Sequence, residues 1–202
     1  FCTGGDVEWE QSWGTTRGPR GHASINEAIL DCPKPVIAVV KGWCIGGGNH
    51  WAYCCDFTIA AHNAKFGQNG PRVGSPADGY MVSHLAKIIG HKRAREMWML
   101  CRRYTAQEAY EMGLVNKVVP LERVDEEAEK WCKELLALSP TCLRILKASF
   151  NGEMDHIRHA RGGYYSKALA PGFDGSEEQR EAQQAFFEKR APDFSNRSPR
   201  RA

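Results

Sequence analysis

Three consecutive glycines at 46–48 stand between a buried-strand pattern and a helix pattern. Glycine allows the backbone to approach a ligand closely, and the first turn of a helix presents unpaired N–H groups. Such a turn suits an anion or a developing oxyanion. The segment lacks the Gly-x-Gly-x-x-Gly pattern and the lysine of a phosphate-binding loop, so nucleotide binding is weakly supported. On spacing alone, a tight structural turn is an equally good interpretation.

A second candidate is the polar, glycine-rich segment at 66–75, Phe-Gly-Gln-Asn-Gly-Pro-Arg-Val-Gly-Ser. It follows a predicted strand, and α/β folds place much of their chemistry on such loops. A glycine-rich connector without function is the alternative. The chain has neither a Gly-x-Ser-x-Gly elbow nor a His-Glu-x-x-His helix, and its seven histidines are scattered. The residue pattern therefore predicts no serine-hydrolase triad and no metal site.

The eight cysteines favour reduced thiols over disulfides or metal ligands. No Cys-x-x-Cys pair occurs, Cys54 and Cys55 are adjacent, and most of the others lie among apolar residues. The N-terminus shows no basic region followed by an apolar stretch and a cleavage site. We therefore expect buried thiols in a reducing cytoplasm.

The elements that must position the two glycine-rich segments follow from apolar patterning. Residues 36–40 form a continuous apolar run typical of a strand covered on both faces, 42–48 are predicted as a turn, 50–55 as a short helix and 56–60 as the next strand. This order is that of a layered α/β domain. Further helices are predicted at 23–30, 80–89, 92–101, 125–138 and 177–190, with a short strand at 115–119. The sequence Thr-Ala-Gln-Glu at 105–108 is a capping box that predicts the start of one more helix.

Composition bounds the class of protein. The 202 residues are 42% hydrophobic and 25% charged, with no apolar run near the roughly 18 residues that a membrane span needs. The net charge is +3, but residues 189–202 carry five basic residues against one aspartate, so the remainder is about neutral. The near-neutral charge of residues 1–188 argues against a domain built to bind nucleic acid, and the lack of a long apolar run argues against a membrane protein.

Five motifs occur in an order that resembles the crotonase (enoyl-CoA hydratase/isomerase) superfamily. They are Phe-Cys-Thr-Gly-Gly-Asp at 1–6, Pro-Lys-Pro-Val-Ile-Ala at 33–38, Gly42 with Ile-Gly-Gly-Gly at 45–48, Cys-Asp-Phe-Thr-Ile-Ala at 55–60, and Phe-Gly-Gln at 66–68. The segments at 67–75, 92–98 and 189–194 resemble the branch of the 1,4-dihydroxy-2-naphthoyl-CoA synthases and the related 2-ketocyclohexanecarboxyl-CoA hydrolase.

The resemblance implies an α/β fold with a crotonase-like ββα spiral core. It divides the chain into a partial core at 1–120 that carries the acyl-CoA site, a helical region at 121–192 that trimerises, and a flexible basic tail at 193–202. The strands that precede this region in the family, and part of the coenzyme A site, would lie before Phe1. Because the helical region packs on neighbouring subunits in the family, the resemblance implies a homo-trimer or hexamer.

The resemblance also implies a site. The backbone N–H groups of Gly5 and Gly47 would hold the thioester oxygen as an oxyanion hole. The position of a glutamate base in many hydratases is Gly70, and the other glutamate position is His50, so a two-glutamate hydratase is not expected.

In one subset of naphthoyl-CoA synthases, a glycine at the position of Gly70 leaves space for a bicarbonate held by a glutamine and a tryptophan, which here are Gln68 and Trp98. Such an anion would serve as the base, and an aspartate placed at position 70 would be expected to replace it. The resemblance gives Ser75 as an active-site hydroxyl and Lys189 as a partner for coenzyme A phosphates.

Two departures from the branch concern the substrate. The aspartate expected two residues after the serine falls on Ala77, with Asp78 one place late, so Asp78 is the candidate. The late active-site tyrosine falls on Phe173 or Asp174, and residues 7–20 lack the tyrosine of the synthases' mobile loop. We therefore expect a substrate other than that of the naphthoyl-CoA synthases.

The function expected is C–C bond formation or cleavage on an acyl-CoA thioester through an enolate, by ring closure or ring-opening hydrolysis. The cofactors implied are bicarbonate and coenzyme A as part of the substrate, without a metal. The alternatives are an enoyl-CoA hydratase or isomerase, for which Asp78 is the only good carboxylate, and a non-catalytic crotonase homologue.

Overall fold

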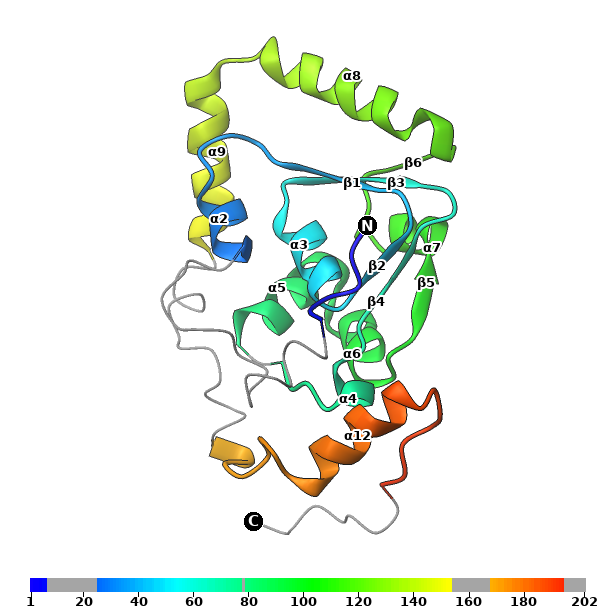
Figure 1. Cartoon of the computed structure of the whole chain (residues 1–202). Helices are drawn as coiled ribbons and strands as arrows, with labels where there is room; N and C mark the ends of the chain where they lie inside the picture. The colour runs from blue at the N-terminus through cyan, green and yellow to red at the C-terminus, as the bar shows by residue number, and fades with distance from the viewer. Residues whose placement is uncertain (7–24, 78, 154–167, 195–202) are drawn as a thin grey trace.

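The computed structural model describes residues 1–6, 25–77, 79–153 and 168–194, and its strands form two three-stranded sheets (Figure 1). The first sheet is entirely parallel, with the order β1 (Ile37–Val40), β3 (Phe57–Ala61) and β6 (Lys117–Val119). The second has the order β2 (Trp43–Ile45), β4 (Lys65–Gly67) and β5 (Arg103–Thr105), in which β4 and β5 are antiparallel.

Helices connect and cover these strands. Those of the first two thirds of the chain are α2 (Ile25–Asp31), α3 (Gly47–Cys54), α4 (Gly70–Val73), α5 (Tyr80–Ile89), α6 (His91–Met99) and α7 (Ala106–Glu111). After them come the 3-10 turn η1 (Leu121–Arg123), α8 (Val124–Leu136), α9 (Pro140–Gly152) and α12 (Glu177–Phe187). The core lies between the strands and α3, α5, α6 and α7, and includes Val40, Phe66 and Leu85, all fully buried.

Several predicted elements are confirmed. The helix expected at 80–89 is α5, and the strands expected at 36–40 and 56–60 are β1 and β3. At the start of α7, the Thr105 Oγ1 accepts from the Glu108 N–H at 3.2 Å, while the Glu108 carboxylate accepts from the Thr105 N–H at 2.7 Å. This reciprocal pair is a capping box.

The expectation that 42–48 is only a turn is wrong, because residues 43–45 form β2. The three-residue strands β4 and β5 and the one-turn helix α4 were not expected either. Each of these elements is too short to show a periodic apolar pattern, and the strands are set by pairing with distant residues. The local apolar pattern therefore does not predict the second sheet.

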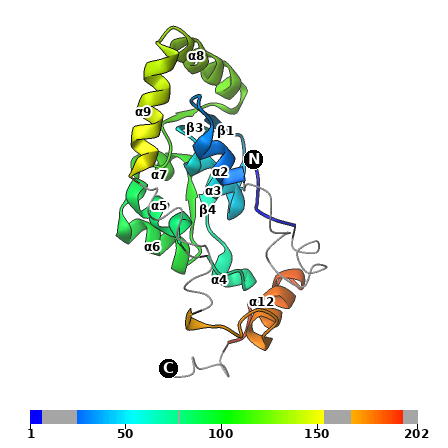
Figure 2. The ribbon, with the colours of Figure 1, turned by 90° about the vertical axis from the view of Figure 1, so that its left-hand side faces the viewer.

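The C-terminal helices lie at two ends of the molecule. In both views α8 and α9 lie at one end and α12 at the other, beside α4 (Figures 1 and 2). A buried ion pair holds α9 to the core: the Lys147 Nζ contacts the Asp56 Oδ2 at 2.7 Å and also donates to the Ile29 and Lys34 carbonyls at 3.0 and 3.1 Å. The Lys147 side chain, 6% exposed, is thereby fully paired.

The apolar side of α8 is less buried than its spacing predicts. Val124 is the one fully buried residue of this helix, while Leu136 is 84% exposed and Cys132 is exposed. All eight cysteines are free, as expected, but only Cys44, Cys54 and Cys101 are buried. Among the described helices, none has the length and apolar character needed to cross a membrane.

Candidate functional site

The glycine turn after β2 is fixed against the N-terminal segment. The Cys2 N–H donates to the Trp43 carbonyl at 2.9 Å, and the Cys2 carbonyl accepts from the Ile45 N–H at 3.0 Å, so this segment runs parallel to β2. A Cβ on Gly48 would overlap the Cys2 carbonyl. A side chain at that position would push the two segments apart, so the close approach requires glycine.

This approach brings the two predicted oxyanion donors together. A Cβ built on Gly47 would lie 3.2 Å from the Gly4 Cα and 4.0 Å from the Gly5 nitrogen, and one built on Gly4 would lie 3.3 Å from the Gly47 nitrogen. Gly47 is also the first residue of α3, where helical N–H groups have no partner within the helix. Amides on two adjacent segments, fixed before a ligand arrives, are suited to stabilising one oxyanion.

Gln68 follows the last residue of β4, and Arg103 of the neighbouring strand fixes its main chain. The Arg103 Nη1 donates to the Gln68 carbonyl at 2.6 Å and to the Cys101 carbonyl at 3.1 Å, and its Nη2 donates to the Asn69 Oδ1 at 2.7 Å. A planar guanidinium can make these bonds at once. The arginine therefore holds the backbone from which the fully buried Gln68 side chain extends.

Five side chains of the described residues have buried polar atoms with no hydrogen-bond partner; two are Asn26 and Asn49, and the other three concern this site. They are both amide atoms of Gln68, the Nε1 of Trp98 and the Nε2 of His50. The rings of His50 and Trp98 lie 5.3 Å apart, centroid to centroid. An unpaired buried polar group costs about 1–3 kcal/mol, so such a concentration indicates partners supplied by a ligand or by water.

The His50 imidazole is neutral at pH 7. Burial disfavours its charged form and lowers its pKa to about 4. The Gln68 side chain lies close enough to favour the imidazolium slightly, but none of its atoms meets hydrogen-bond geometry with the ring. The cluster therefore offers N–H donors and an acceptor without a fixed charge, which suits a small polar molecule or a single anion.

Gly70 is required by the loop that follows Gln68. A Cβ at this position would lie 2.5 Å from the Ser75 carbonyl oxygen and 3.9 Å from the Trp98 ring. The Ser75 N–H also donates to the Gly70 carbonyl at 3.0 Å, which closes the turn around α4. The space next to Gly70 is thus partly taken by the chain itself. An aspartate placed at position 70 would therefore have to displace the Ser75 carbonyl.

A pocket of about 490 Å³ adjoins this loop. It joins residues from two distant parts of the chain, and its lining includes Gly70, Ser75, Trp98, Phe173, Glu178 and Phe194. Three of the predicted site residues therefore share one pocket. Of the two candidates for the family tyrosine position, Phe173 lines the pocket, whereas Asp174 is exposed and does not.

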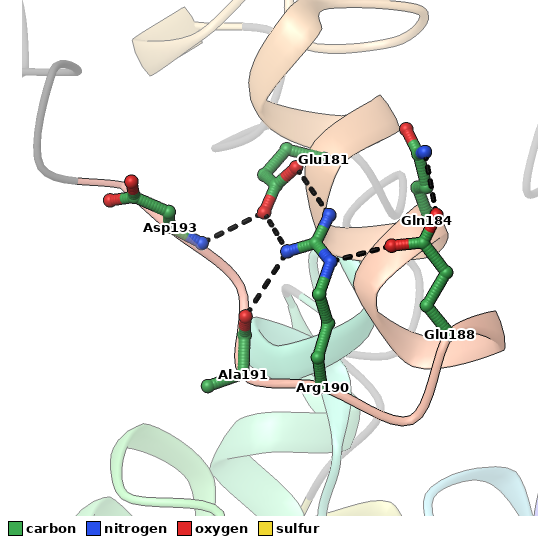
Figure 3. A network of polar contacts seen from close by, with 6 residues as sticks. All are labelled: Glu181, Gln184, Glu188, Arg190, Ala191 and Asp193. Atoms are coloured by element: carbon green, nitrogen blue, oxygen red, sulfur yellow. Dashed lines mark hydrogen bonds and ion pairs between the residues drawn. The ribbon is translucent and has the colours of Figure 1, made fainter.

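The C-terminal wall of the pocket is fastened by polar contacts. The Gln179 Nε2 donates to the Gly74 carbonyl at 3.1 Å, which holds α12 against the loop after α4. Past α12, Arg190 makes a bidentate ion pair with Glu181 at 2.6 and 3.0 Å and a further bond to Glu188 at 2.6 Å (Figure 3). The Asp193 N–H also donates to Glu181, at 2.8 Å. These bonds fold the chain back along α12 and bring Phe194 to the pocket.

The remaining predicted residues lie elsewhere. Lys189 is exposed just after α12, with a left-handed backbone (φ 54°), and is not among the residues that line the pocket. Asp78 and the segment at 7–20 lie outside the described residues. In the described part of the chain, no group of three or more His, Cys, Asp or Glu side chains could hold a metal ion.

Four residues that the fold brings to the site were given no role from sequence: His50, named only as the occupant of a family glutamate position, and Arg103, Glu178 and Phe194. Each is placed by a long-range contact. A hint existed for Arg103, because a glycine opposite it in β4 allows the two strands to approach: a Cβ on Gly67 would lie 2.6 Å from the Arg102 carbonyl. No local signal marks the other three.

Comparisons with known proteins identify the family and the fold. The family model described as Enoyl-CoA hydratase/isomerase matches residues 1–197. A solved methylmalonyl-CoA decarboxylase in complex with 2-nitronate-propionyl-CoA is similar, with a TM-score of 0.79 and 24% identity over 96% of this chain and 76% of that one.

Two further solved structures are similar at higher identity. An enoyl-CoA hydratase from Mycobacterium avium subsp. paratuberculosis K-10 has a TM-score of 0.73 and 29% identity over 85% of this chain and 70% of its own. An enoyl-CoA hydratase from Bacillus anthracis has a TM-score of 0.58 and 31% identity over 83% of this chain and 65% of its own. The expected crotonase-like fold is confirmed, and the chain belongs to the enoyl-CoA hydratase/isomerase family of the crotonase superfamily.

Proposed function

We propose that the protein makes or breaks a C–C bond of an acyl-CoA thioester through an enolate. The Gly5 and Gly47 amides would hold the thioester oxygen, whose negative charge grows as the neighbouring carbon loses its proton. Their support is geometric, since the two backbone segments are in contact and glycine at 48 permits that contact. Removing one such donor typically lowers turnover by about 100- to 1,000-fold.

The observation that carries this proposal is the unpaired Gln68 amide and Trp98 N–H. Both are buried donors with no hydrogen bond to a described carboxylate, which fits bicarbonate as the group they would hold. When bound, bicarbonate would supply a base whose strength suits proton abstraction near neutral pH. Gln68 and Trp98 would bind and orient it, while Ser75 at the pocket would position the acyl group.

The acyl group that suits the pocket is an apolar ring. Phe173 presents aromatic carbon where the resemblance implies a phenol that would donate a hydrogen bond, and Phe194 adds a second apolar ring to the lining. A polar aromatic acid would leave its oxygens unpaired there, at about 1–3 kcal/mol per buried group. A cyclic keto-acyl-CoA is therefore the preferred substrate class, for either ring closure or ring-opening hydrolysis, and the assignment to the naphthoyl-CoA synthase branch rests on sequence motifs alone.

The test compares two substrates in degassed buffer with and without added bicarbonate. We expect turnover of 2-ketocyclohexanecarboxyl-CoA to exceed that of o-succinylbenzoyl-CoA, to fall without bicarbonate and to recover when the salt returns. Gln68→Leu should abolish the response. Gln107→Leu is the matched control, because Gln107 is an exposed glutamine on α7 that bonds only Glu111 among the described residues. Full turnover without bicarbonate would refute the proposed base.

A second candidate is an enoyl-CoA hydratase or isomerase, which needs a carboxylate near the reacting carbons. Glu178 gives this alternative a specific basis, because it lines the same pocket as Gly70 and Trp98. Loss of absorbance with crotonyl-CoA, abolished in Glu178→Gln and indifferent to bicarbonate, would favour it over the first proposal.

We also propose that α8 and α9 pack against further copies of the chain in a trimer or hexamer. Large apolar side chains on these helices are exposed, including Leu136 at 84% and Phe150 at 79%. Such side chains together on one end of the molecule are typical of an interface. Light scattering of the purified protein measures the number of copies directly.

A further inference from the structure

Among the histidines of the described residues, His50 alone has a buried ring nitrogen without a hydrogen-bond partner, and its ring lies beside Trp98 of the proposed anion site. Its ring lies 5.3 Å from that of Trp98 and 5.6 Å from that of Tyr53, so aromatic contacts on two sides fix its orientation. Its main-chain N–H donates to the Gly46 carbonyl at 3.0 Å, within the regular helix α3. The imidazole is therefore held in place while its Nε2 remains without a partner.

The position of His50 on α3 relates it to the oxyanion donor. Residues three apart on a helix share a face, so the His50 side chain extends on the same face as Gly47. A group held by His50 would consequently lie on the side of the helix where the thioester oxygen is proposed to bind. Gly47 and His50 both belong to α3, so the helix itself fixes their positions relative to one another.

A planar anion with three oxygens has one oxygen to which the His50 Nε2 could donate. A trigonal oxyanion has three oxygens, and the Gln68 Nε2 and Trp98 Nε1 can each donate to one of them. A neutral imidazole carries one N–H, and the anion would select the tautomer that has it on Nε2. This donor would leave both the charge of the site and the fold around it unchanged.

We propose that His50 is the third side-chain ligand of the anion site formed with Gln68 and Trp98, donating its Nε2–H to the oxygen that the other two do not bind. This inference rests on the proposed function, since it concerns the same anion. It assigns to His50 a role in holding the base beside the Gly47 amide rather than in removing the substrate proton itself.

The test measures anion binding without substrate. Nitrate is the probe, because it is planar and monovalent like bicarbonate but does not change protonation in the working pH range. Calorimetric titration of the full chain should give at least a tenfold loss of nitrate affinity in His50→Leu, and less than a threefold loss in His50→Gln, which keeps an N–H donor. His84→Leu is the matched control, since its ring also packs on Tyr53, at 5.7 Å from another helix, but none of its atoms is among the unpaired buried ones.

The outcomes separate this inference from the proposed function. If Gln68→Leu weakens nitrate binding and His50→Leu does not, the role of His50 is overturned while the anion site stands. If the wild-type chain binds no nitrate, the anion site is refuted and the role of His50 with it. Should His50→Leu fail to fold, as judged by near-ultraviolet circular dichroism, an equal loss of affinity in His50→Gln and Gln68→Leu would overturn the inference, and retention of affinity in His50→Gln alone would support it.

Discussion

Replacing Arg103 with methionine should loosen the chain at Gln68 more than its partial exposure suggests. The guanidinium makes three hydrogen bonds, and the shortest, at 2.6 Å, goes to the Gln68 carbonyl. Hydrogen bonds from a charged donor contribute about 1.5–3 kcal/mol each when buried. The bond to Asn69 is exposed, and water would replace most of it. We therefore expect Arg103→Met to lower the free energy of unfolding by about 2 kcal/mol.

The assay is urea denaturation followed by tryptophan fluorescence, with nitrate titration as a second measurement. Arg102→Met is the matched control, because Arg102 pairs with Glu96 at 2.7 Å in solvent, with 58% of its side chain exposed. That variant should lose much less stability and no nitrate affinity. Arg103→Lys should recover only part of the loss, since a single ammonium cannot match the fork of a guanidinium. Equal destabilisation by the two methionine variants, with unchanged nitrate binding in both, would refute the reasoning.

Three further predictions concern packing and thiol chemistry. Lys147→Met should cost about 3–5 kcal/mol in the free energy of unfolding, because it leaves the Asp56 carboxylate without its cation, although the Val36 N–H still donates to it at 2.7 Å; a melting temperature like that of wild type would contradict this. Gly70→Ala should cost about 1–3 kcal/mol and reduce turnover, since its Cβ meets the Ser75 carbonyl, and calorimetry would show it. Burial raises the pKa of the Cys44 thiol far above its usual range, so Ellman's reagent should modify the two exposed thiols of α8 and α9 first, and Cys44 only after denaturation.

The parts of the fold that could be predicted from sequence are those with a strong local signal. The helix at 80–89 has a clear apolar stripe, and the capping box at Thr105 is complete within four residues. The strands β2, β4 and β5 have three residues each and depend on pairing, so no local pattern reveals them. In α8 the local signal is strong but the outcome is not predicted by it. An apolar stripe on a helix predicts that this face is buried, but it does not identify what the face packs against, and most of the apolar side of α8 is not buried.

Some features of the site could likewise be predicted from sequence, and others could not. The five ordered motifs gave Gly47 and Gln68, and the segment at 92–98 gave Trp98; of these, Gln68 and Trp98 have buried polar atoms without a partner in the described structure. The tight approach at Gly70 and the arrival of Phe194 depend on contacts across the whole chain. Sequence could therefore suggest which residue types the site uses, but not which spaces are already filled.

The contact between α12 and the loop after α4 also has a consequence for synthesis of the protein. Gln179 and Gly74 are 105 positions apart in the chain. At typical translation rates, about 5 to 20 seconds separate the emergence of these two residues from the ribosome. During that interval, the apolar surface that Ala182 will cover, beside Gly74, has no partner of its own chain. Until the last elements are made, the nascent protein therefore exposes the earlier wall of its pocket, which includes Gly70, Ser75 and Trp98, to chaperones or to misassociation.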